Sequence, residues 1–202
     1  MRESEQLLDL ARKEFECAAE AKDPAQMKVH AEMGHHYLAR AEAAAAQAAT
    51  LLAAFRHRSY PIVHVQHIAV RPGARFFLPD TPGAEIHESV RPAAGEMIVQ
   101  KNFPNSFRNT PLLELLQSRG VTELLIAGMM THMCVDTTTR AAADLGFTCS
   151  LAHDACATKA LSFNGVYVDA AGVHAAYLAA LNGLFARVLS ARELCAGLRP
   201  NT

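Results

Sequence analysis

The sequence predicts a three-layer α/β/α fold with a mostly parallel, doubly wound sheet, extended by a helical segment at the N-terminus. From Pro61 onward, short apolar runs typical of buried strands alternate with helical patterns, which indicates a parallel sheet covered on both faces. Half of the 202 residues are apolar and 19% are charged, so one domain can bury a proper core. Because crossovers between parallel strands are right-handed, a doubly wound arrangement is the natural solution.

The first 58 residues differ in composition from the rest and are predicted to be helical. Apolar residues recur at helical spacing between Leu7 and Ala18, and Asp23-Pro24 predicts a break before a second helix. This second helix is expected to continue to about Arg58, because the stretch contains no further proline. We divide the chain into a helical N-terminal segment, residues 1–38, and a main α/β domain, residues 39–202.

The elements expected after residue 60 alternate between strands and helices. A long loop rich in proline and glycine, residues 69–95, separates the first strand from the second. Pro111 fits the first turn of a helix capped by Thr110, and Gly120 and Gly146 fit helix ends. In chain order we expect strands at 62–65, 97–101, 123–127, 148–152 and 186–189, and helices at 110–119, 134–145 and 170–184.

The charge balance argues against a nucleic-acid or membrane partner. Nineteen Lys and Arg residues are scattered among 20 Asp and Glu residues, for a formal net charge of −1. No apolar run reaches the roughly 18 residues that a transmembrane helix needs, and the N-terminus lacks the basic-then-apolar layout of a signal peptide. We expect a cytoplasmic protein that acts on a small molecule and needs no cofactor.

The five cysteines indicate free thiols. Their number is odd and none forms a Cys-x-x-Cys pair, so the sequence predicts neither a disulfide framework nor a zinc site. Cys134 differs from the other four in its position, because it follows a predicted strand and begins a predicted helix.

Lys101 and Cys134 both lie near predicted strand ends, where ligands bind in parallel α/β sheets. At the first turn of a helix, unpaired N–H groups favour the thiolate form of Cys134, and a nearby ammonium group adds to this. A thiolate in such a place is suited to nucleophilic catalysis. The alternative is that Cys134 is a buried small apolar residue and Lys101 a solvated surface charge.

The sequence around Cys134 resembles the nucleophile segment of the isochorismatase-like cysteine hydrolases. Lys101, followed shortly by Ser106-Phe107, is similar to another segment of that family, and the likeness extends from about Ala39 to about Leu189. The segments that carry it are Gly128-Met-Met-Thr-His-Met-Cys-Val-Asp-Thr-Thr-Thr-Arg140, Asp144-Leu-Gly-Phe147, His153-Asp-Ala-Cys-Ala-Thr158 and the loop Pro82-Gly-Ala-Glu-Ile-His87.

The resemblance implies an Asp–Lys–Cys triad in which Cys134 is the nucleophile and Lys101 its electrostatic partner. It also implies a cis peptide bond between Met129 and Met130, just before Thr131. That bond would aim the N–H of Met130, together with that of Cys134, at a developing oxyanion. The implied chemistry is attack on an amide-type carbonyl, a thioester intermediate and hydrolysis.

The aspartate of this triad has no clear counterpart in the sequence. In the family it ends a first strand, whereas Asp9, the nearest match, lies among apolar residues with helical phase. His67, after the first predicted strand, and His132, two residues before Cys134, are candidate substitute bases; the alternative for each is a hydrogen-bonded or surface histidine. Loss of the strand would leave a gap that helices, a rearranged sheet or a partner subunit would fill.

No metal site is predicted. Nicotinamidase-type members of the family place Asp-x-His after the second strand, and Gln66-His-Ile-Ala69 lacks the Asp and the second His. Our main hypothesis is a cysteine-dependent hydrolase of a small amide-like substrate, located in residues 39–202. The alternative is a catalytically impaired member that acts in assembly or ligand binding, and we expect a homo-oligomer formed through the Ala-rich helix. The composition shift near residue 40 also fits a rearranged N-terminus on an ordinary enzyme.

Overall fold

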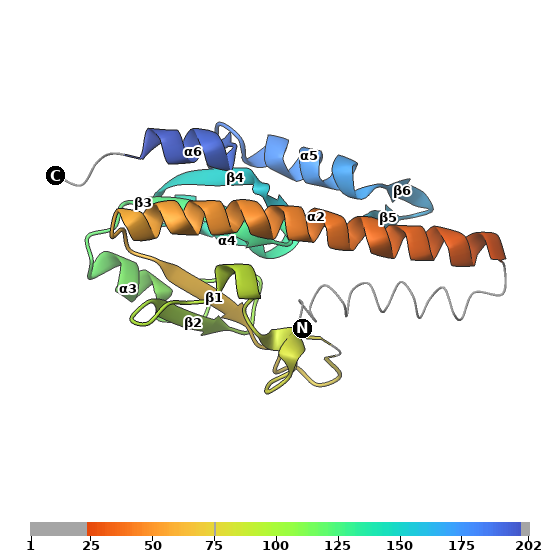
Figure 1. Ribbon diagram of the computed structural model, residues 1–202, viewed down its shortest axis with the longest axis horizontal. Helices are drawn as coiled ribbons and strands as arrows, with labels where there is room; N and C mark the ends of the chain where they lie inside the picture. Colours follow the sequence, from red (N-terminus) through yellow and green to blue (C-terminus); the bar gives the residue numbers. More distant parts are fainter. Residues whose placement is uncertain (1–23, 75, 199–202) are drawn as a thin grey trace.

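The structure is a computed structural model that describes residues 24–74 and 76–198. It has three layers, with helices on both sides of a set of parallel strands (Figure 1). One layer contains α2 (Pro24–His57) and α6 (Ala191–Gly197). The opposite layer contains α3 (Leu112–Gln117), α4 (Asp136–Asp144) and α5 (Ala170–Leu181). The predicted three-layer α/β/α fold is therefore confirmed.

The strands between these layers form two separate groups. In the first, β1 (Val63–His67) pairs in parallel with β2 (Met97–Lys101). In the second, β4 (Thr148–Ala157) lies between β3 (Glu123–Met129) and β7 (Arg187–Leu189), also in parallel. Within the described residues, β1 and β3 are not hydrogen-bonded to each other and no other strand joins them. The single sheet that the sequence predicts is therefore divided into two. A short antiparallel hairpin, β5 (Leu161–Phe163) and β6 (Val166–Val168), extends from the end of β4.

Of the three buried apolar clusters in the described residues, two contain large buried side chains and hold the layers together. The larger lies between the strands and the layer of α3, α4 and α5, and includes Val99 of β2, Leu116 of α3 and Leu151 of β4. The smaller joins Leu51 of α2 to Ala152 of β4 and Leu194 of α6. Each buried side chain contributes roughly 1.5–3 kcal/mol of transfer free energy if it is as large as Leu or Val, so these clusters dominate the stability of the fold.

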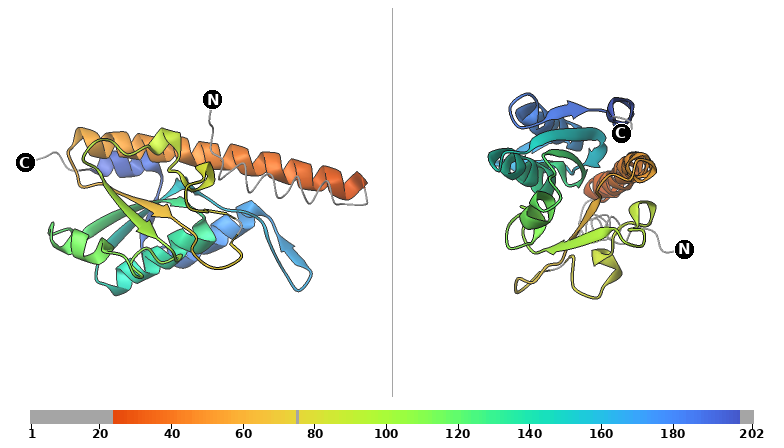
Figure 2. Two further views of the ribbon diagram at one scale, coloured as in Figure 1. Left: turned by 90° about the horizontal axis from the view of Figure 1, so that it is seen from below. Right: turned by 90° about the vertical axis from the view of Figure 1, so that its left-hand side faces the viewer.

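Helix α2 contacts β3 and β4 of the second group, and η2 (Glu88–Val90), the 3₁₀ turn in the loop that connects β1 to β2. Figure 2 shows how it extends along the strands. Its alanines, which favour the helical state, are nearly inaccessible where it crosses the second group: Ala41 is 0% exposed and Ala44 is 2% exposed. Small side chains at these positions let the helix approach the strands closely. Towards its C-terminal end, α2 turns a charged side chain, Arg56, to the first group.

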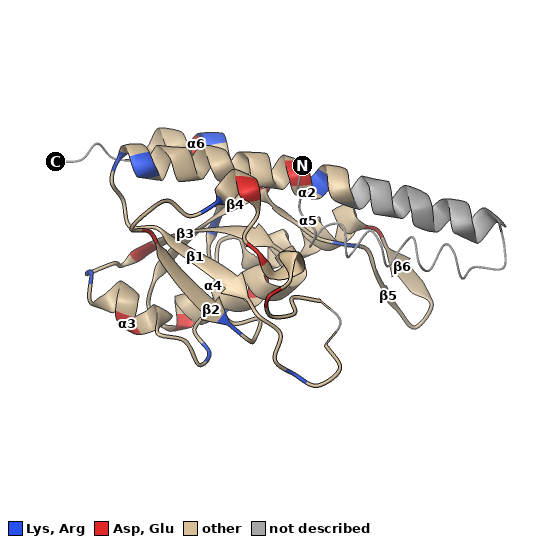
Figure 3. Ribbon diagram, turned by 60° about the horizontal axis from the view of Figure 1, so that its bottom comes forward, with Lys and Arg blue, Asp and Glu red and all other residues tan. Residues whose placement is uncertain are grey.

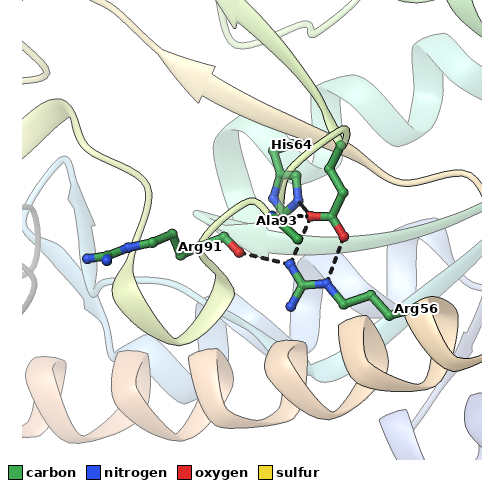
Figure 4. Close-up of polar contacts among 5 residues, drawn as sticks. Arg56, His64, Arg91 and Ala93 are labelled. Carbon is green, nitrogen blue, oxygen red and sulfur yellow. Dashed lines mark hydrogen bonds and ion pairs between the residues drawn. The ribbon is translucent and has the colours of Figure 1, made fainter.

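Arg56 binds Glu96 in a cluster that ties α2 to the first group of strands (Figure 4). Its Nε and Nη2 donate to the two carboxylate oxygens at 2.7 and 2.8 Å, and Nη2 also donates to the Arg91 carbonyl at 2.8 Å. The same carboxylate accepts from the Ala93 amide at 2.8 Å and lies 2.7 Å from Nε2 of His64 on β1. The hydrogen bonds from Arg56 are the main cause that lowers the pKa of Glu96 to about 2.

The predicted elements agree well with the structure, with several differences, including α5, which ends at Leu181, three residues before its predicted end. Helix α4 begins at Asp136, two residues later than expected, because residues 131–135 form a separate turn. Strand β4 continues to Ala157, five residues beyond its predicted end. The β5–β6 hairpin and α6 were not predicted, although the Ser190 and Glu193 side chains form a capping box at the start of α6.

Two predictions for the N-terminal region stay untested. The helix expected between Leu7 and Ala18, together with Asp9, lies outside the described residues. The boundary predicted at residues 38 and 39 falls inside the continuous helix α2, and the division into two domains stays a prediction.

In the described part, charges of both signs are scattered (Figure 3), and no described helix is long and apolar enough to cross a membrane.

Candidate active site

The carboxyl ends of β1, β2 and β3 open into one cavity of about 1320 Å³. This is the place where parallel α/β sheets bind ligands. Of the predicted site residues, all but Thr131 line it: His67, Lys101, Met129, Met130, His132 and Cys134. The structure therefore brings together residues that are far apart in the sequence, such as His67 and Cys134, which are separated by 67 positions.

Lys101 ends β2 and is buried, at 4% exposure. Its Nζ donates a hydrogen bond of 2.7 Å to the carbonyl of Pro104. The Thr138 hydroxyl of α4 donates to the same carbonyl at 3.3 Å, and accepts from the Ser106 amide at 3.1 Å. The loop after β2 is thus held against the helix that follows Cys134, which fixes the ammonium group at the cavity.

Cys134 is half-buried and lies in η3 (Thr131–Val135), a single turn of π-helix that leads directly into α4. The prediction that Cys134 opens the α-helix was wrong by two residues, because this wider turn intervenes. Single π-helical turns are uncommon and often occur at functional sites. The peptide bond between Met129 and Met130, immediately before the turn, is cis, at the position that the resemblance implied.

Thr131 holds η3 against α5 rather than facing the cavity. It is fully buried, and its hydroxyl lies 2.9 Å from Nδ1 of His174. Nε2 of His174 donates to the carbonyl of His153 at 3.1 Å, so Nδ1 of the neutral ring is left to accept from Thr131. Burial is the main cause that lowers the pKa of His174, which favours this neutral form. Sequence reasoning did not identify His174, since its partner lies 43 residues away.

The two candidate bases differ in their contacts. His67 is the register partner of Lys101 in the β1–β2 pair, and its ring packs on Phe77 with centroids 5.0 Å apart. Its Nδ1 is buried without a hydrogen-bond partner among the described residues. Burial, and then the charge of Lys101, lower the pKa of His67, so the ring is neutral near pH 7 and able to accept a proton.

His132 is already engaged by a neighbouring hydroxyl. Its Nδ1 forms a short hydrogen bond with Thr158 Oγ1, and its ring meets Tyr177 edge-on. Burial, followed by the charge of Lys159, lowers its pKa. Both histidines are therefore neutral near pH 7, and Nδ1 of His67 is a buried ring nitrogen without a hydrogen-bond partner among the described residues.

The described residues supply no carboxylate partner for Lys101: its hydrogen bond goes to a backbone carbonyl, and none of the described ion pairs includes it. Asp136, the acidic residue nearest Cys134 in sequence, is bound by Arg140 one turn along α4 at 2.9 Å. Within the same described part of the chain, no group of three or more His, Cys, Asp and Glu side chains is arranged to hold a metal ion.

The fold and the strand-end cavity define a three-layer α/β protein with a ligand site at the carboxyl ends of its strands, and comparison with known proteins identifies the family. Residues 28–193 match the family model of the isochorismatase domain. The chain belongs to the isochorismatase family, whose members are hydrolases.

Individual relatives agree with this assignment. The chain is 49% identical to an uncharacterized isochorismatase family protein, YddQ of Bacillus subtilis, over 77% of this chain and 86% of that protein. A crystal structure of an isochorismatase hydrolase from Oleispira antarctica superposes with a TM-score of 0.76 at 52% identity, covering 78% of this chain and 83% of that one. A streptothricin hydrolase of Streptomyces noursei is 43% identical over 54% of this chain and 38% of its own length. Nicotinamidase 3 of Arabidopsis thaliana is 27% identical over 63% of this chain and 70% of its own length.

Proposed function

We propose that this protein hydrolyses the C–N bond of a small amide-type substrate, with Cys134 as the nucleophile. The observation that carries the proposal is the placement of Cys134, Lys101 and His67 around one cavity at the strand ends. The resemblance to cysteine hydrolases and the relationship to a nicotinamidase support an amide-type carbonyl as the target.

In the proposed reaction, His67 accepts the thiol proton and the Cys134 sulfur bonds to the carbonyl carbon. As the tetrahedral intermediate collapses, the C–N bond breaks and the amine leaves with that proton, which generates a thioester. Water then gives a proton to His67 and adds its hydroxide to the thioester; the C–S bond breaks to release a carboxylic acid, and the proton on His67 returns to the sulfur to restore the thiol. The Lys101 ammonium stabilises the negative charge that develops in both steps.

Timed alkylation of the folded chain with chloroacetamide, a small electrophilic amide, followed by mass spectrometry of its proteolytic peptides, tests this proposal. Cys149 and Cys156 serve as internal controls, because burial raises the pKa of both thiols, that of Cys156 to about 12. Cys195, which is half-buried like Cys134, controls for accessibility. We expect Cys134 to be alkylated at least about 10-fold faster than Cys195. Equal rates at the two residues would contradict the proposal.

A second candidate function is ligand binding without turnover. It is favoured by the absence of a carboxylate partner for Lys101 among the described residues. This candidate predicts no hydrolysis across a panel of primary and secondary amides, with ligand binding that Cys134→Ala leaves unchanged. A hydrolase activity that Cys134→Ala abolishes would exclude it and support the first proposal.

A further inference from the structure

Thr131 begins the turn that carries Cys134, and its surroundings require a hydrogen-bond partner from outside that turn. Its side chain is fully buried, and a buried hydroxyl left without a partner costs roughly 1–3 kcal/mol. The partner is Nδ1 of His174, 2.9 Å away on α5, the helix that packs against η3. This contact therefore joins the first residue of the turn to a separate layer of the fold.

His174 is held in place by β4, at a point where that strand bulges. The pairing of β4 with β3 is interrupted there, because residues 152–155 of β4 lie opposite the single residue Ala127. His153 belongs to this bulge, and its carbonyl accepts a hydrogen bond of 3.1 Å from Nε2 of His174. Bulges are frequent next to active sites, where they end regular pairing or redirect a side chain. Here the bulge presents a backbone carbonyl to a side chain of α5.

The His153 carbonyl also decides the direction of both hydrogen bonds. A carbonyl oxygen can only accept, so Nε2 of His174 carries the hydrogen. In the neutral ring Nδ1 is then an acceptor, and the Thr131 hydroxyl donates to it. The imidazole ring thus connects the central strand of the larger group to η3, with one partner for each nitrogen.

The location of this link gives it a route to the reaction. Thr131 lies three residues before Cys134 in the same turn, so a shift of Thr131 moves the sulfur and the backbone N–H groups around it. When a sulfur attacks a carbonyl group, negative charge develops on the oxygen, and fixed N–H donors stabilise that charge. A displacement of about 1 Å at such a site can lower the rate about 100-fold.

His174 can act only through this route, because neither it nor Thr131 lines the cavity. His132, the next residue of the turn, differs in this respect. It lines the cavity, and its own partner is the Thr158 hydroxyl that follows β4. The turn is therefore tied to the rest of the fold at two consecutive residues, and the tie through His174 is the one that is remote from the substrate.

We propose that His174 is a positioning residue for the proposed hydrolysis. Held by the His153 carbonyl, it orients η3 through Thr131, so that the Cys134 sulfur and the N–H groups of the turn meet the substrate carbonyl together. This inference rests on the proposed function, and it adds a residue that contacts no reacting atom.

Two reagents that modify Cys134 by different reactions test the inference on the full chain. With chloroacetamide, the thiolate displaces chloride and no oxyanion forms. With p-nitrophenyl acetate, the sulfur adds to the carbonyl carbon and the C–O bond breaks, which releases nitrophenolate and leaves an acetyl thioester. The rate constant of each reaction is measured, and the rate found with Cys134→Ala is subtracted as background.

The variants separate an effect on position from an effect on stability. His174→Ala and Thr131→Val each remove one side of the hydrogen bond, whereas His174→Asn keeps an acceptor near the place of Nδ1. Val173→Ala is the matched control, because it opens a cavity at the neighbouring buried position of α5 and keeps the hydrogen bond.

We expect His174→Ala to slow acetylation of Cys134 by at least about 10-fold, while alkylation changes by less than about 2-fold. Thr131→Val should act in the same way, and the double variant should lose no more than either single variant, because both remove one hydrogen bond. His174→Asn should recover part of the acetylation rate. Val173→Ala should leave the ratio of the two rates unchanged.

Several results would overturn the inference. Equal slowing of both reactions, in His174→Ala and Val173→Ala alike, would leave His174 a role in stability alone. Additive effects of the His174 and Thr131 substitutions would mean that the two residues act independently. If His174→Ala does not fold, Thr131→Val, which keeps the shape of the side chain, decides the test.

The proposed function fails in a different way. An unmodified chain that is acetylated no faster than Cys134→Ala would overturn the proposed hydrolysis together with the role of His174. Rapid acetylation of the unmodified chain and of both single variants would overturn the role of His174 alone.

Discussion

The two groups of strands are stabilised in different ways, and the candidate site lies between them. In the larger group, β4 is paired on both sides, and its Leu151 and Ala152 are fully buried between helices. In the smaller group, neighbouring residues of β2 differ strongly in exposure: Val99 is 2% exposed and Ile98 is 52% exposed. The smaller group is held beside β3 by the buried side of β2, where Val99 belongs to the same apolar cluster as Leu151, and by contacts at its ends, the Arg56–Glu96 cluster and the loop after Lys101.

This difference explains how Cys134 and Lys101 are held in position relative to each other. Cys134 follows the larger group and Lys101 ends the smaller one, so no sheet hydrogen bond links the two residues directly. Their relative position relies on the apolar cluster that Val99 shares with Leu151 and on a few polar contacts. Substitutions in the larger group should therefore change the free energy of unfolding of the whole domain. Substitutions in the Arg56–Glu96 cluster or in the loop after Lys101 should change the position of the smaller group relative to the larger one.

The largest effect is expected for Leu151→Ala in the larger group. The substitution leaves a cavity at a fully buried position in β4, which lowers the free energy of unfolding by about 2–5 kcal/mol. Ile98→Ala, at a half-exposed position of β2, is the matched control and should change it by less than about 1 kcal/mol. Urea unfolding monitored by circular dichroism gives both values. Similar losses for the two variants would mean that the groups are equally buried in solution.

Glu96→Gln tests the tie between α2 and the smaller group. Loss of the charged hydrogen bonds with Arg56 should lower the free energy of unfolding, by less than Leu151→Ala, because the exposed Arg56 side chain is screened by water. Glu114→Gln, on the exposed face of α3, is the control and should be near neutral. In the Glu96 variant, amides of β1 and β2 should exchange faster than those of β4. Uniform acceleration in both groups would contradict a role confined to the tie.

The same carboxylate gives a pH dependence with a defined sign. Its pKa is lowered from 4.5 to about 2 in the folded protein, so between these values the unfolded chain binds more protons. The contribution of Glu96 is complete above about pH 4.5 and is lost as the pH falls towards 2. Glu96→Gln lacks this contribution, so the stability difference between the two proteins should shrink across that range. A difference that stays constant down to pH 2 would rule out the depressed pKa.

A smaller effect is expected for Thr138→Val, which removes the hydroxyl that links α4 to Pro104 and Ser106. The free energy of unfolding should fall by about 1 kcal/mol, the typical value for a neutral hydrogen bond. Alkylation of Cys134 should also change, because the Lys101 loop is no longer held at α4. Thr137→Val, on the same helix and outside the cavity, controls for the loss of a hydroxyl. If both variants behave alike, the Thr138 contacts do not position Lys101.

Periodicity and strand-end reasoning predicted most of this arrangement. Strands β1, β2, β3 and β7 have apolar runs bounded by turn residues, and Cys134 and Lys101 stand at their ends. The sequence predicted that one strand of the sheet is missing. It did not predict how the remaining strands would be arranged, because that depends on how α2 packs against them, which no local pattern specifies. Thr138 and His174 were missed because their roles come from partners 34 and 43 residues away. The π-helical turn at Cys134 was missed because its residues fit an α-helix equally well.

The smallest expected effect concerns the electrostatic contact at the end of the smaller group. Burial, and then the charge of Lys101, hold the pKa of His67 below 6.5. Lys101→Met removes the second cause and leaves the first, so the pKa of His67 should rise but remain below 6.5. Imidazole NMR titration of the two proteins measures this shift without requiring turnover.

His132 provides the control within the same titration. Its pKa is lowered by burial and by Lys159, so it should be unaffected by Lys101→Met. A rise at His67 alone would show that Lys101 and His67 act on each other across the β1–β2 pair, as their shared register implies. Equal rises at both histidines would instead indicate that the cavity opens to water when Lys101 is lost. In that case Lys101 would act chiefly by closing the space between the two groups of strands.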